Sequence, residues 1–419
     1  MNASEVPAPP DDANKPAGGR PIPDVALAKH INHTPFPSQY YQSINQHGEV
    51  FHVVATRITY DLRNTWGQNY LRYAARQTAL ERSDVWDGVP NESSPLWESD
   101  FAPYKPKCDV LAVNAVSRPD QGVWGKLSGT RPAARRWSCG IALQWLGEDK
   151  QPRIWHKQFV VTGERTHSAL IGVSEPKATH EVRIHWQNAF GGQIKEPVED
   201  RLDRAGRIIQ SAGSKRWLID ERNPVGHGLN QSHGSRAPQL EPSVSQPYHG
   251  QKKYPPVCLT ALGKAWLPRR LLAGTYDKQW RDQQWPLPPM DFDFAYWNCA
   301  PADQQIDYPA PGTQLDLFAL YPPDPVLSWP DHFTANLPPH QLFIYAYVLF
   351  AVDKRSDILA NLDTLVINMA TLQLYATYRV VVPASELPSG SAPLVLETRM
   401  APSGQMCESV PSSELGPLG

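Results

Sequence analysis

The sequence lacks long apolar runs and has almost no net charge. No apolar stretch approaches about 18 residues, so we expect no membrane-spanning segment. The formal charge is −2, from 40 Lys and Arg against 42 Asp and Glu, which argues against binding to nucleic acid or to an anionic membrane. Residues 1–24 show neither a basic region nor an apolar core, so no signal peptide is expected. These features favour a protein of the cytoplasm.

Closely spaced cysteines are also missing. The five cysteines are odd in number and scattered, and no two have the C-x-x-C spacing of a zinc or redox site. They are Cys108, Cys139, Cys258, Cys299 and Cys407. We therefore expect reduced and mostly buried thiols.

The common catalytic signatures are absent as well. The sequence contains no G-x-S-x-G elbow, no phosphate-binding G-x-x-x-x-G-K-[ST] loop and no G-x-G-x-x-G after a predicted strand. His180-Glu181 followed by His185 is similar to a zinc protease motif, but its spacing is one residue too long. On a strand, positions 180 and 185 point to opposite faces. We predict no catalytic residue, no metal and no cofactor.

Proline, in contrast, is abundant, at 42 of 419 residues or about 10%, against about 5% in an average protein. This excludes a long-helix bundle. Alternating apolar and polar residues predict strands at His180–Trp186 and Leu372–Val382, and the latter is expected to form an antiparallel hairpin with Thr364–Asn368. Further predicted strands are Phe51–Leu62, Asp109–Val116, Arg136–Trp145, Arg153–Thr162, Leu315–Leu320 and Gln341–Val352.

Helical signals are few. Arg269–Trp285 is the best candidate for one short helix, and Gln68–Glu81 is equally compatible with a helix and with extended chain. The predicted fold class is mainly β, with multi-stranded antiparallel sheets or sandwich-like lobes, few short helices and long proline-rich loops.

The organisation follows from composition. Residues 1–24 and 385–419 are rich in proline and polar residues, so we expect two unstructured tails around an ordered domain at 25–384. The segment 226–256 is rich in Gly, Ser, Gln and Pro and long for a loop. This segment either separates two β lobes or forms a long functional loop, and the sequence alone does not decide between these two interpretations.

Four sets of polar residues are candidates for chemical sites. Asp291 and Asp293 face the same way on an extended chain, which would suit a β-rich hydrolase, but solvated loop acids are the simpler interpretation. Residues 303–305 are expected to bond loop backbone. His227 is interpreted as an exposed loop histidine, and the basic doublets, Arg269-Arg270 among them, as solvated surface.

Aromatic residues are plentiful, with 14 Trp, 16 Tyr and 11 Phe. Such side chains dominate the energetics of cores and interfaces. The abundance suits a protein that recognises another protein, and composition alone does not separate this from a carbohydrate-binding β protein.

An ordered series of short motifs carries a family resemblance. The motifs run from residue 32 to residue 367 and are each weak alone. They are Asn32-His33-Thr34-Pro35-Phe36, the strand at 52–62, Ser99-Asp100-Phe101-Ala102-Pro103-Tyr104-Lys105-Pro106, Asn188-Ala189-Phe190-Gly191-Gly192, Asn223-Pro224-Val225-Gly226, Trp266-Leu267-Pro268-Arg269-Arg270, Ala273-Gly274-Thr275-Tyr276-Asp277, Asn298-Cys299-Ala300-Pro301 and Leu362-Asp363-Thr364. Together they resemble the type VI secretion effector-adaptor family, long catalogued as a domain of unknown function, over roughly residues 27–383.

The resemblance implies a bacterial cytoplasmic adaptor or chaperone. Members of that family are encoded beside VgrG spike proteins, PAAR-like tips and toxins; they bind an effector, stabilise it and help load it onto the spike. The family has no established catalytic residue to carry over. The sequence leaves the effector, the stoichiometry and the partner-binding residues unknown. The candidate regions are Gly226–Pro256, Trp266–Trp285, and Leu342–Phe350 if it is an exposed edge strand.

Overall fold

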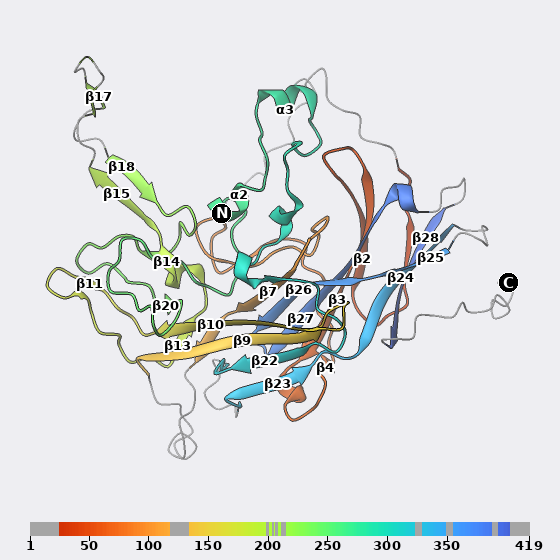
Figure 1. Cartoon of the computed structure of the whole chain (residues 1–419), viewed down its shortest axis with the longest axis horizontal. Coiled ribbons are helices and arrows are strands. Elements are labelled where there is room, and N and C mark those ends of the chain that lie inside the picture. The colour runs from red at the N-terminus through yellow and green to blue at the C-terminus, as the bar shows by residue number, and fades with distance from the viewer. Residues whose placement is uncertain are drawn as a thin grey trace, which may run out of the picture.

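The computed structural model describes residues 25–117, 134–197, 201–202, 205, 208–210, 215–322, 329–348, 355–387 and 393–402. Strands dominate this part of the chain, which confirms the predicted mainly-β class (Figure 1). The tail predicted at 1–24 and Cys407 lie outside the described residues.

A seven-stranded sheet forms the centre of the molecule. Its order is β2-β3-β27-β26-β7-β21, with β4 also paired to β3, and all pairs are antiparallel except β26 with β7. The strands are β2 (Ser38–Ile44), β3 (Val50–Asp61), β4 (Arg72–Tyr73), β7 (Cys108–Val113), β21 (Gln305–Ile306), β26 (Asn361–Asn368) and β27 (Gln373–Pro383). The β26–β27 pair confirms the hairpin predicted from alternation.

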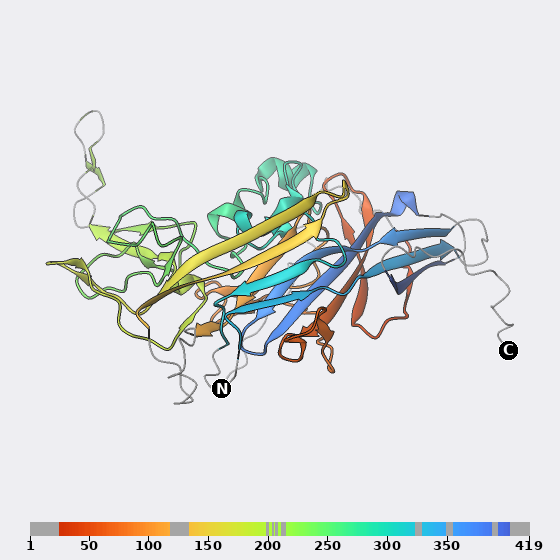
Figure 2. The same cartoon turned by 60° about the horizontal axis from the view of Figure 1, so that its bottom comes forward.

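A five-stranded antiparallel sheet covers most of one face of the central sheet (Figure 2). Its order is β20-β10-β9-β22-β23, with β9 and β10 forming a long hairpin. The strands are β9 (Arg136–Leu146), β10 (Pro152–Thr162), β20 (Leu240–Glu241), β22 (Gln314–Phe318) and β23 (His332–Asn336). Ile141 and Phe159 from this sheet share one core with Ile58, Ala112 and Leu374 from the central sheet.

A four-stranded sheet covers the rest of that face. Its order is β1-β28-β24-β25, and Ile344 and Leu396 pack on Val54 and Val380 of the central sheet. The strands are β1 (Lys29–Asn32), β24 (His340–Val348), β25 (Arg355–Leu359) and β28 (Leu394–Pro402). The prediction of an unstructured tail over 385–419 was therefore wrong for β28, because β28 satisfies its backbone by pairing along its whole length with β24.

Loops cover the opposite face of the central sheet. Leu111 and Val366 point to this side, where they pack against Leu96, Ala261 and Cys299 from loop segments. The remaining strands form small two-stranded pairs, which lie between residues 85 and 228. They are β5 (Val85–Trp86) with β6 (Pro95–Trp97), β8 (Ala115–Ser117) with β13 (Glu181–Arg183), β11 (His167–Ser168) with β12 (Gly172–Val173), β14 (Phe190–Gly191) with β19 (His227–Gly228), β15 (Gln193–Pro197) with β18 (Lys215–Ile219) and β16 (Arg201–Leu202) with β17 (Ile208–Gln210).

Helices are short. Instead of one helix over Arg269–Trp285, the described chain has α2 (Leu267–Arg270) and α3 (Lys278–Gln283), separated by a turn in which Gly274 has a φ of +78°. The segment Gln68–Glu81 is extended and contains only β4. Single 3₁₀ turns are η2 (Arg63–Thr65), η3 (Trp186–Asn188), η4 (Phe294–Trp297), η5 (Ala302–Gln304) and η6 (Ala384–Glu386). Among the described residues, no helix has the length and apolarity needed to span a bilayer.

Two glycine-containing motifs, at residues 188–192 and 223–226, pack closely against each other. Gly192 donates its N–H to the carbonyl of Asn223 at 2.8 Å, and the Asn223 amide bonds the carbonyls of Trp186 and Phe190. A Cβ on Gly192, whose φ is +100°, would lie 2.3 Å from the carbonyl oxygen of Gly226. Only glycine fits this approach.

Candidate functional site

A buried ion pair lies where residues 105–109 meet Thr364 and the motif at residues 298–300. Lys105 Nζ donates to Asp109 Oδ2 at 2.8 Å and to Thr364 Oγ1 at 2.9 Å. The other bonds to the Asp109 carboxylate come from the 298–300 motif: the Asn298 amide donates at 3.1 Å and the Cys299 N–H at 3.0 Å. Burial alone would lower the pKa of Lys105, but the Asp109 carboxylate outweighs it and the pKa is raised.

A second set of buried charges lies beside the first. Arg379 Nε donates to Asp363 Oδ2 at 2.5 Å, and its Nη1 bonds the backbone carbonyls of Asp100 and Ala102 at 2.7 and 2.8 Å. Arg57 Nη2 lies 2.5 Å from the Asp100 carboxylate. β3 carries Arg57 and β27 carries Arg379, so the central sheet presents both guanidinium groups to the 99–106 motif.

Thr364 joins the two sets. Its hydroxyl accepts from Lys105 and donates to Asp363 Oδ1 at 2.9 Å. We call the linked side chains the buried ionic network. Its charged members are Arg57, Asp100, Lys105, Asp109, Asp363 and Arg379, and each is at most 5% exposed.

A separate buried pair anchors α2. Both nitrogens at the tip of the Arg269 guanidinium bond the Glu98 carboxylate, and Nη2 also bonds the Tyr296 carbonyl at 2.6 Å. Arg269 is 2% exposed. The prediction that this basic doublet is solvated was therefore wrong for Arg269, because a carboxylate 171 positions away along the chain compensates its charge inside the protein.

Sequence reasoning singled out none of these charged residues as a group. The motif series does contain Asp100, Lys105, Arg269 and Asp363, but the motifs were interpreted only as a family signature. The available signal was a charge within a strand pattern, as at Arg57 inside the predicted strand 51–62. Such a position is costly to bury unless a partner is present. The network can hold segments of the fold together, and its burial leaves it no contact with a dissolved substrate.

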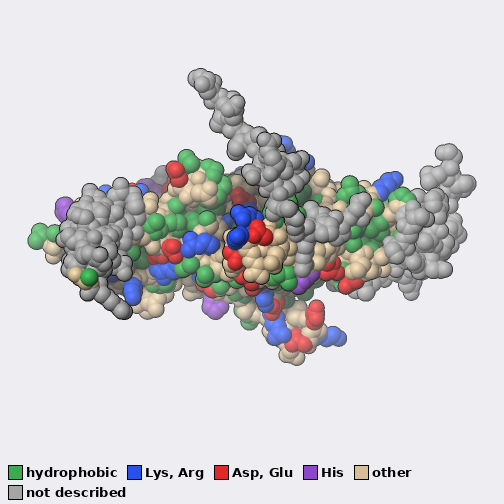
Figure 3. Space-filling view, turned by 90° about the horizontal axis from the view of Figure 1, so that it is seen from above, with side chains coloured by type: hydrophobic (Ala, Val, Ile, Leu, Met, Phe, Trp, Pro, Cys, Tyr) green, Lys and Arg blue, Asp and Glu red, His purple; other side chains and the backbone are tan. Residues whose placement is uncertain are grey.

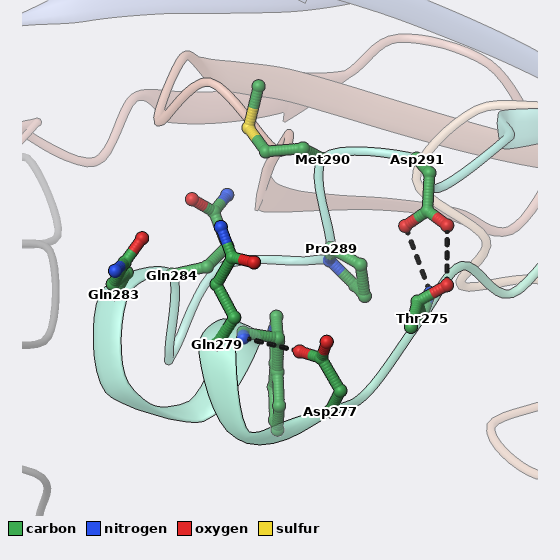
Figure 4. A pocket seen from close by; sticks show the side chains of 9 residues that line it. Thr275, Asp277, Gln279, Gln283, Gln284, Pro289, Met290 and Asp291 are labelled. Carbon is green, nitrogen blue, oxygen red and sulfur yellow. Dashed lines mark hydrogen bonds between the residues drawn. The ribbon is translucent and has the colours of Figure 1, made fainter.

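An open pocket at α3 contains one of the two predicted acids (Figure 4). The pocket has a volume of about 310 Å³. Its nine lining residues are Thr275, Asp277, Gln279, Trp280, Gln283, Gln284, Pro289, Met290 and Asp291. The walls are therefore amide-rich, and the lining includes no histidine or cysteine.

Both carboxylates of the predicted pair bond their own turns. Asp291 accepts from the Thr275 N–H at 2.9 Å and from its hydroxyl at 2.7 Å, and these bonds lower the pKa of Asp291 (Figure 4). Asp293 accepts from the Ala295 N–H at 2.8 Å and caps η4. The structure thus places Asp291 in a pocket and Asp293 at a cap, without a shared hydrogen-bond partner between them.

Exposed apolar side chains lie at the pocket and beside it. Tyr276 is 57% exposed and packs edge-on against Trp280, with ring centroids 4.7 Å apart. Met290 and Leu271 are also exposed. The predicted region Trp266–Trp285 is therefore mixed, because Trp266 is buried against Trp186 while Leu271 and Tyr276 are exposed.

The remaining predicted polar residues have structural positions. Gln304 donates to the Val110 carbonyl at 2.9 Å and Gln305 to the Ala300 carbonyl at 2.8 Å, so these two side chains bond backbone as predicted. The Asp303 side chain instead pairs with Lys157. His227 is half-buried, so the prediction of an exposed loop histidine was wrong, and its backbone pairs with Phe190 in β14–β19. Burial lowers the pKa of the His227 ring to about 4.

The other two candidate binding regions also take definite positions. β24 lies between β28 and β25, so the aromatic segment predicted at 342–350 is not an edge over its described residues. The segment 226–256 has a small core of its own, where Tyr248 and Tyr254 pack on Phe190. Across the described ranges, no three His, Cys, Asp or Glu side chains are grouped to hold a metal ion.

These features define a mainly-β protein in which apolar cores join the sheets and buried charges tie the central sheet to the loops on its other face. Residues 47–379 match the model of a bacterial family described as "uncharacterized protein conserved in bacteria" (DUF2169), and the chain belongs to that family. Neither the curated proteins nor the solved structures contain a match.

Proposed function

We propose that this chain is a bacterial cytoplasmic adaptor that binds a type VI secretion effector, stabilises it and helps load it onto a VgrG or PAAR-like carrier. The observation that carries the proposal is the convergence of the motif series. Motifs around residues 100, 299 and 363 are far apart in sequence and meet in the buried ionic network. The resemblance to effector adaptors therefore extends to residues that contact one another.

The surface is suited to gripping a protein. On the face that carries α3, basic and acidic side chains are interspersed with hydrophobic ones (Figure 3). Tyr276, Met290 and Leu271 add exposed apolar area there. Protein interfaces combine apolar and aromatic anchors with a polar rim, and release at loading favours a contact of moderate size.

Stabilisation of a toxin follows from mass action. A partner that binds only the folded effector stabilises it by about 2.7 kcal/mol when its free concentration is a hundredfold above Kd. The adaptor therefore needs a rigid binding surface and no chemistry of its own.

Co-expression with the toxin encoded by the adjacent gene tests the proposal. We expect a complex that survives size-exclusion chromatography and a higher soluble yield of the toxin. Deletion of the adaptor gene should abolish delivery of that one toxin while spike assembly continues. A toxin that stays soluble alone and never co-elutes with the chain would contradict the proposal.

A further inference from the structure

β10 is paired fully on one side and hardly at all on the other. Its inner neighbour β9 matches it from Pro152 to Thr162. Its outer neighbour β20 pairs only with Val160 and Val161. Within the described residues, no strand continues along the outer side of the seven residues from 152 to 158. This open edge is roughly 23 Å long at about 3.3 Å per residue.

The hydrogen-bond pattern shows which backbone groups face outward. At the hairpin turn, Gly147 N–H bonds the Gln151 carbonyl at 2.9 Å, so odd positions of β10 bond β9. Even positions therefore point their N–H and C=O to the open side. Thr162 confirms this, because its N–H donates outward to the Gln239 carbonyl at 2.8 Å. The outward residues of the open edge are Ile154, His156 and Gln158, and no backbone bond joins them to another described segment.

A groove lies beside this edge, where β20 turns away. The cavity has a volume of about 460 Å³, and three consecutive residues of β10, from His156 to Gln158, form one side. The other side includes Pro242, Pro255 and Pro256. Proline has no N–H, so these prolines cannot donate to the open carbonyls of the strand. The apolar prolines and the unsatisfied backbone together are complementary to an extended chain.

The charges and exposed side chains at the groove indicate what kind of extended chain could bind there. Lys157 and Asp303 both line the groove and pair with each other, so it has no strong excess of one sign. Ile154 and Leu146 are 68% and 60% exposed at the outer end of the hairpin. Ile154, which lies on β10 itself, offers an apolar contact to a side chain of an added strand.

We propose that the outer edge of β10 binds an extended segment of the client polypeptide. This segment adds a strand to the five-stranded sheet, on the side of β10 where β20 pairs only with Val160 and Val161. The segment is uncharged in its central residues and carries apolar side chains at alternate positions facing the proline wall. Strand addition takes its affinity from main-chain bonds and its specificity from alternate side chains. This inference rests on the proposed function for the identity of the client, the effector.

A matched pair of proline variants tests the edge. His156→Pro removes one outward N–H and leaves the bonds to β9, since proline is tolerated at outward positions of edge strands. Asp357→Pro is the control on β25, another edge strand. The Ala360 N–H bonds the Leu342 carbonyl, so even positions of β25 face β24 and the exposed Asp357 faces outward.

Two probes are used with the full-length chain. The first is the toxin encoded by the adjacent gene, and the second is a phage-displayed library of random 12-residue peptides. We expect His156→Pro to raise the Kd for the toxin or a selected peptide at least tenfold, and Asp357→Pro to leave it unchanged. Hydrogen exchange of the unmodified chain is the variant-free readout, in which the amides of Ile154, His156 and Gln158 slow at least tenfold in the complex.

The outcomes separate the two proposals. A toxin complex that protects other segments and tolerates His156→Pro overturns the edge site and leaves the adaptor function standing. Selected peptides that require the edge, without a toxin complex, support the edge site and overturn the adaptor function. Failure of both probes overturns both. A dimer of the free chain that His156→Pro abolishes assigns the edge to a second copy and overturns the client site.

Discussion

Lys105 and Asp109 form an ion pair inside the protein, with 2.8 Å between Nζ and Oδ2 and exposed fractions of 4% and 0%. They are four residues apart in sequence, yet no helix holds them together. The Lys105 side chain instead reaches the first residues of β7, where Thr364 of the adjacent β26 also bonds it. The pair therefore ties the loop that precedes β7 to β7 and β26 of the central sheet.

Removing one charge of this pair should be severely destabilising. Asp109→Asn leaves the Lys105 charge buried without its counter-ion, and we expect the free energy of unfolding to fall by about 3–5 kcal/mol. Urea denaturation at pH 7 measures the change. The control is Asp307→Asn, which breaks the exposed pair with Lys107 and should alter stability by less than about 1 kcal/mol. Similar effects of the two variants would contradict a structural role for the buried pair.

The close contact between Gly192 and the Gly226 carbonyl should tolerate no side chain at residue 192. Gly192→Ala would place a Cβ 2.3 Å from the Gly226 carbonyl oxygen, so we expect a loss of about 2 kcal/mol or more and a lower Tm. Gly234→Ala is the matched control, because its φ of +80° is also left-handed but its Cβ would meet no atom within 4 Å. Thermal denaturation of both variants separates the steric clash at Gly192 from the backbone strain that both positions share. Equal losses of Tm in the two variants would refute the steric clash.

His227 should make stability pH-dependent. Its pKa is lowered to about 4 in the folded chain from 6.5, first by burial and then by Arg236 and His185. The unfolded chain therefore binds a proton more readily, and stability is full above pH 6.5 and is lost as the pH falls to about 4. The contribution is at most on the order of 3 kcal/mol, since the ring is only partly buried.

Substitution of His227 isolates this contribution from that of other groups. We expect His227→Gln to flatten the dependence of the unfolding free energy between pH 6.5 and 4. Urea denaturation across that range gives the slope for both proteins. An unchanged slope would show that the ring is solvated in the folded state.

The buried thiols should resist alkylation. Cys108, Cys139, Cys258 and Cys299 are free, and each is at most 2% exposed. Burial raises the pKa of Cys258 to about 11 and also raises the pKa values of the other three, so the reactive thiolate is scarce at pH 8. Iodoacetamide labelling mapped by mass spectrometry should modify these four positions only after addition of urea. Rapid labelling of the native chain at any of them would show local opening.

Local patterns predicted the strands well. The segments 51–62 and 153–162 were recognised from their composition and alternation, and the structure has them as β3 and β10. The alternation at 372–382 and its proximity to 364–368 were enough for the β26–β27 hairpin. Side-chain alternation is a property of a few neighbouring residues, so it can be detected without knowledge of the partner strand.

Features that depend on distant segments were missed. Arg269 has the appearance of a surface residue until Glu98 is placed beside it. The aromatic strand β24 was a candidate edge, and it became interior because β28 pairs with it from a segment whose composition indicated a tail. The open edge of β10 was likewise invisible, since it depends on where β20 leaves the sheet. No pattern within a short window contains these pairings.

The parallel pairing of β1 with β28 joins residues 29–32 to residues 395–398. β28 is the middle strand that links β1 to β24, so the four-stranded sheet cannot assemble until residue 402 has been translated. During synthesis β24 and β1 therefore remain without β28, the strand that pairs with both. The four-stranded sheet is therefore completed only after β28 has been synthesised.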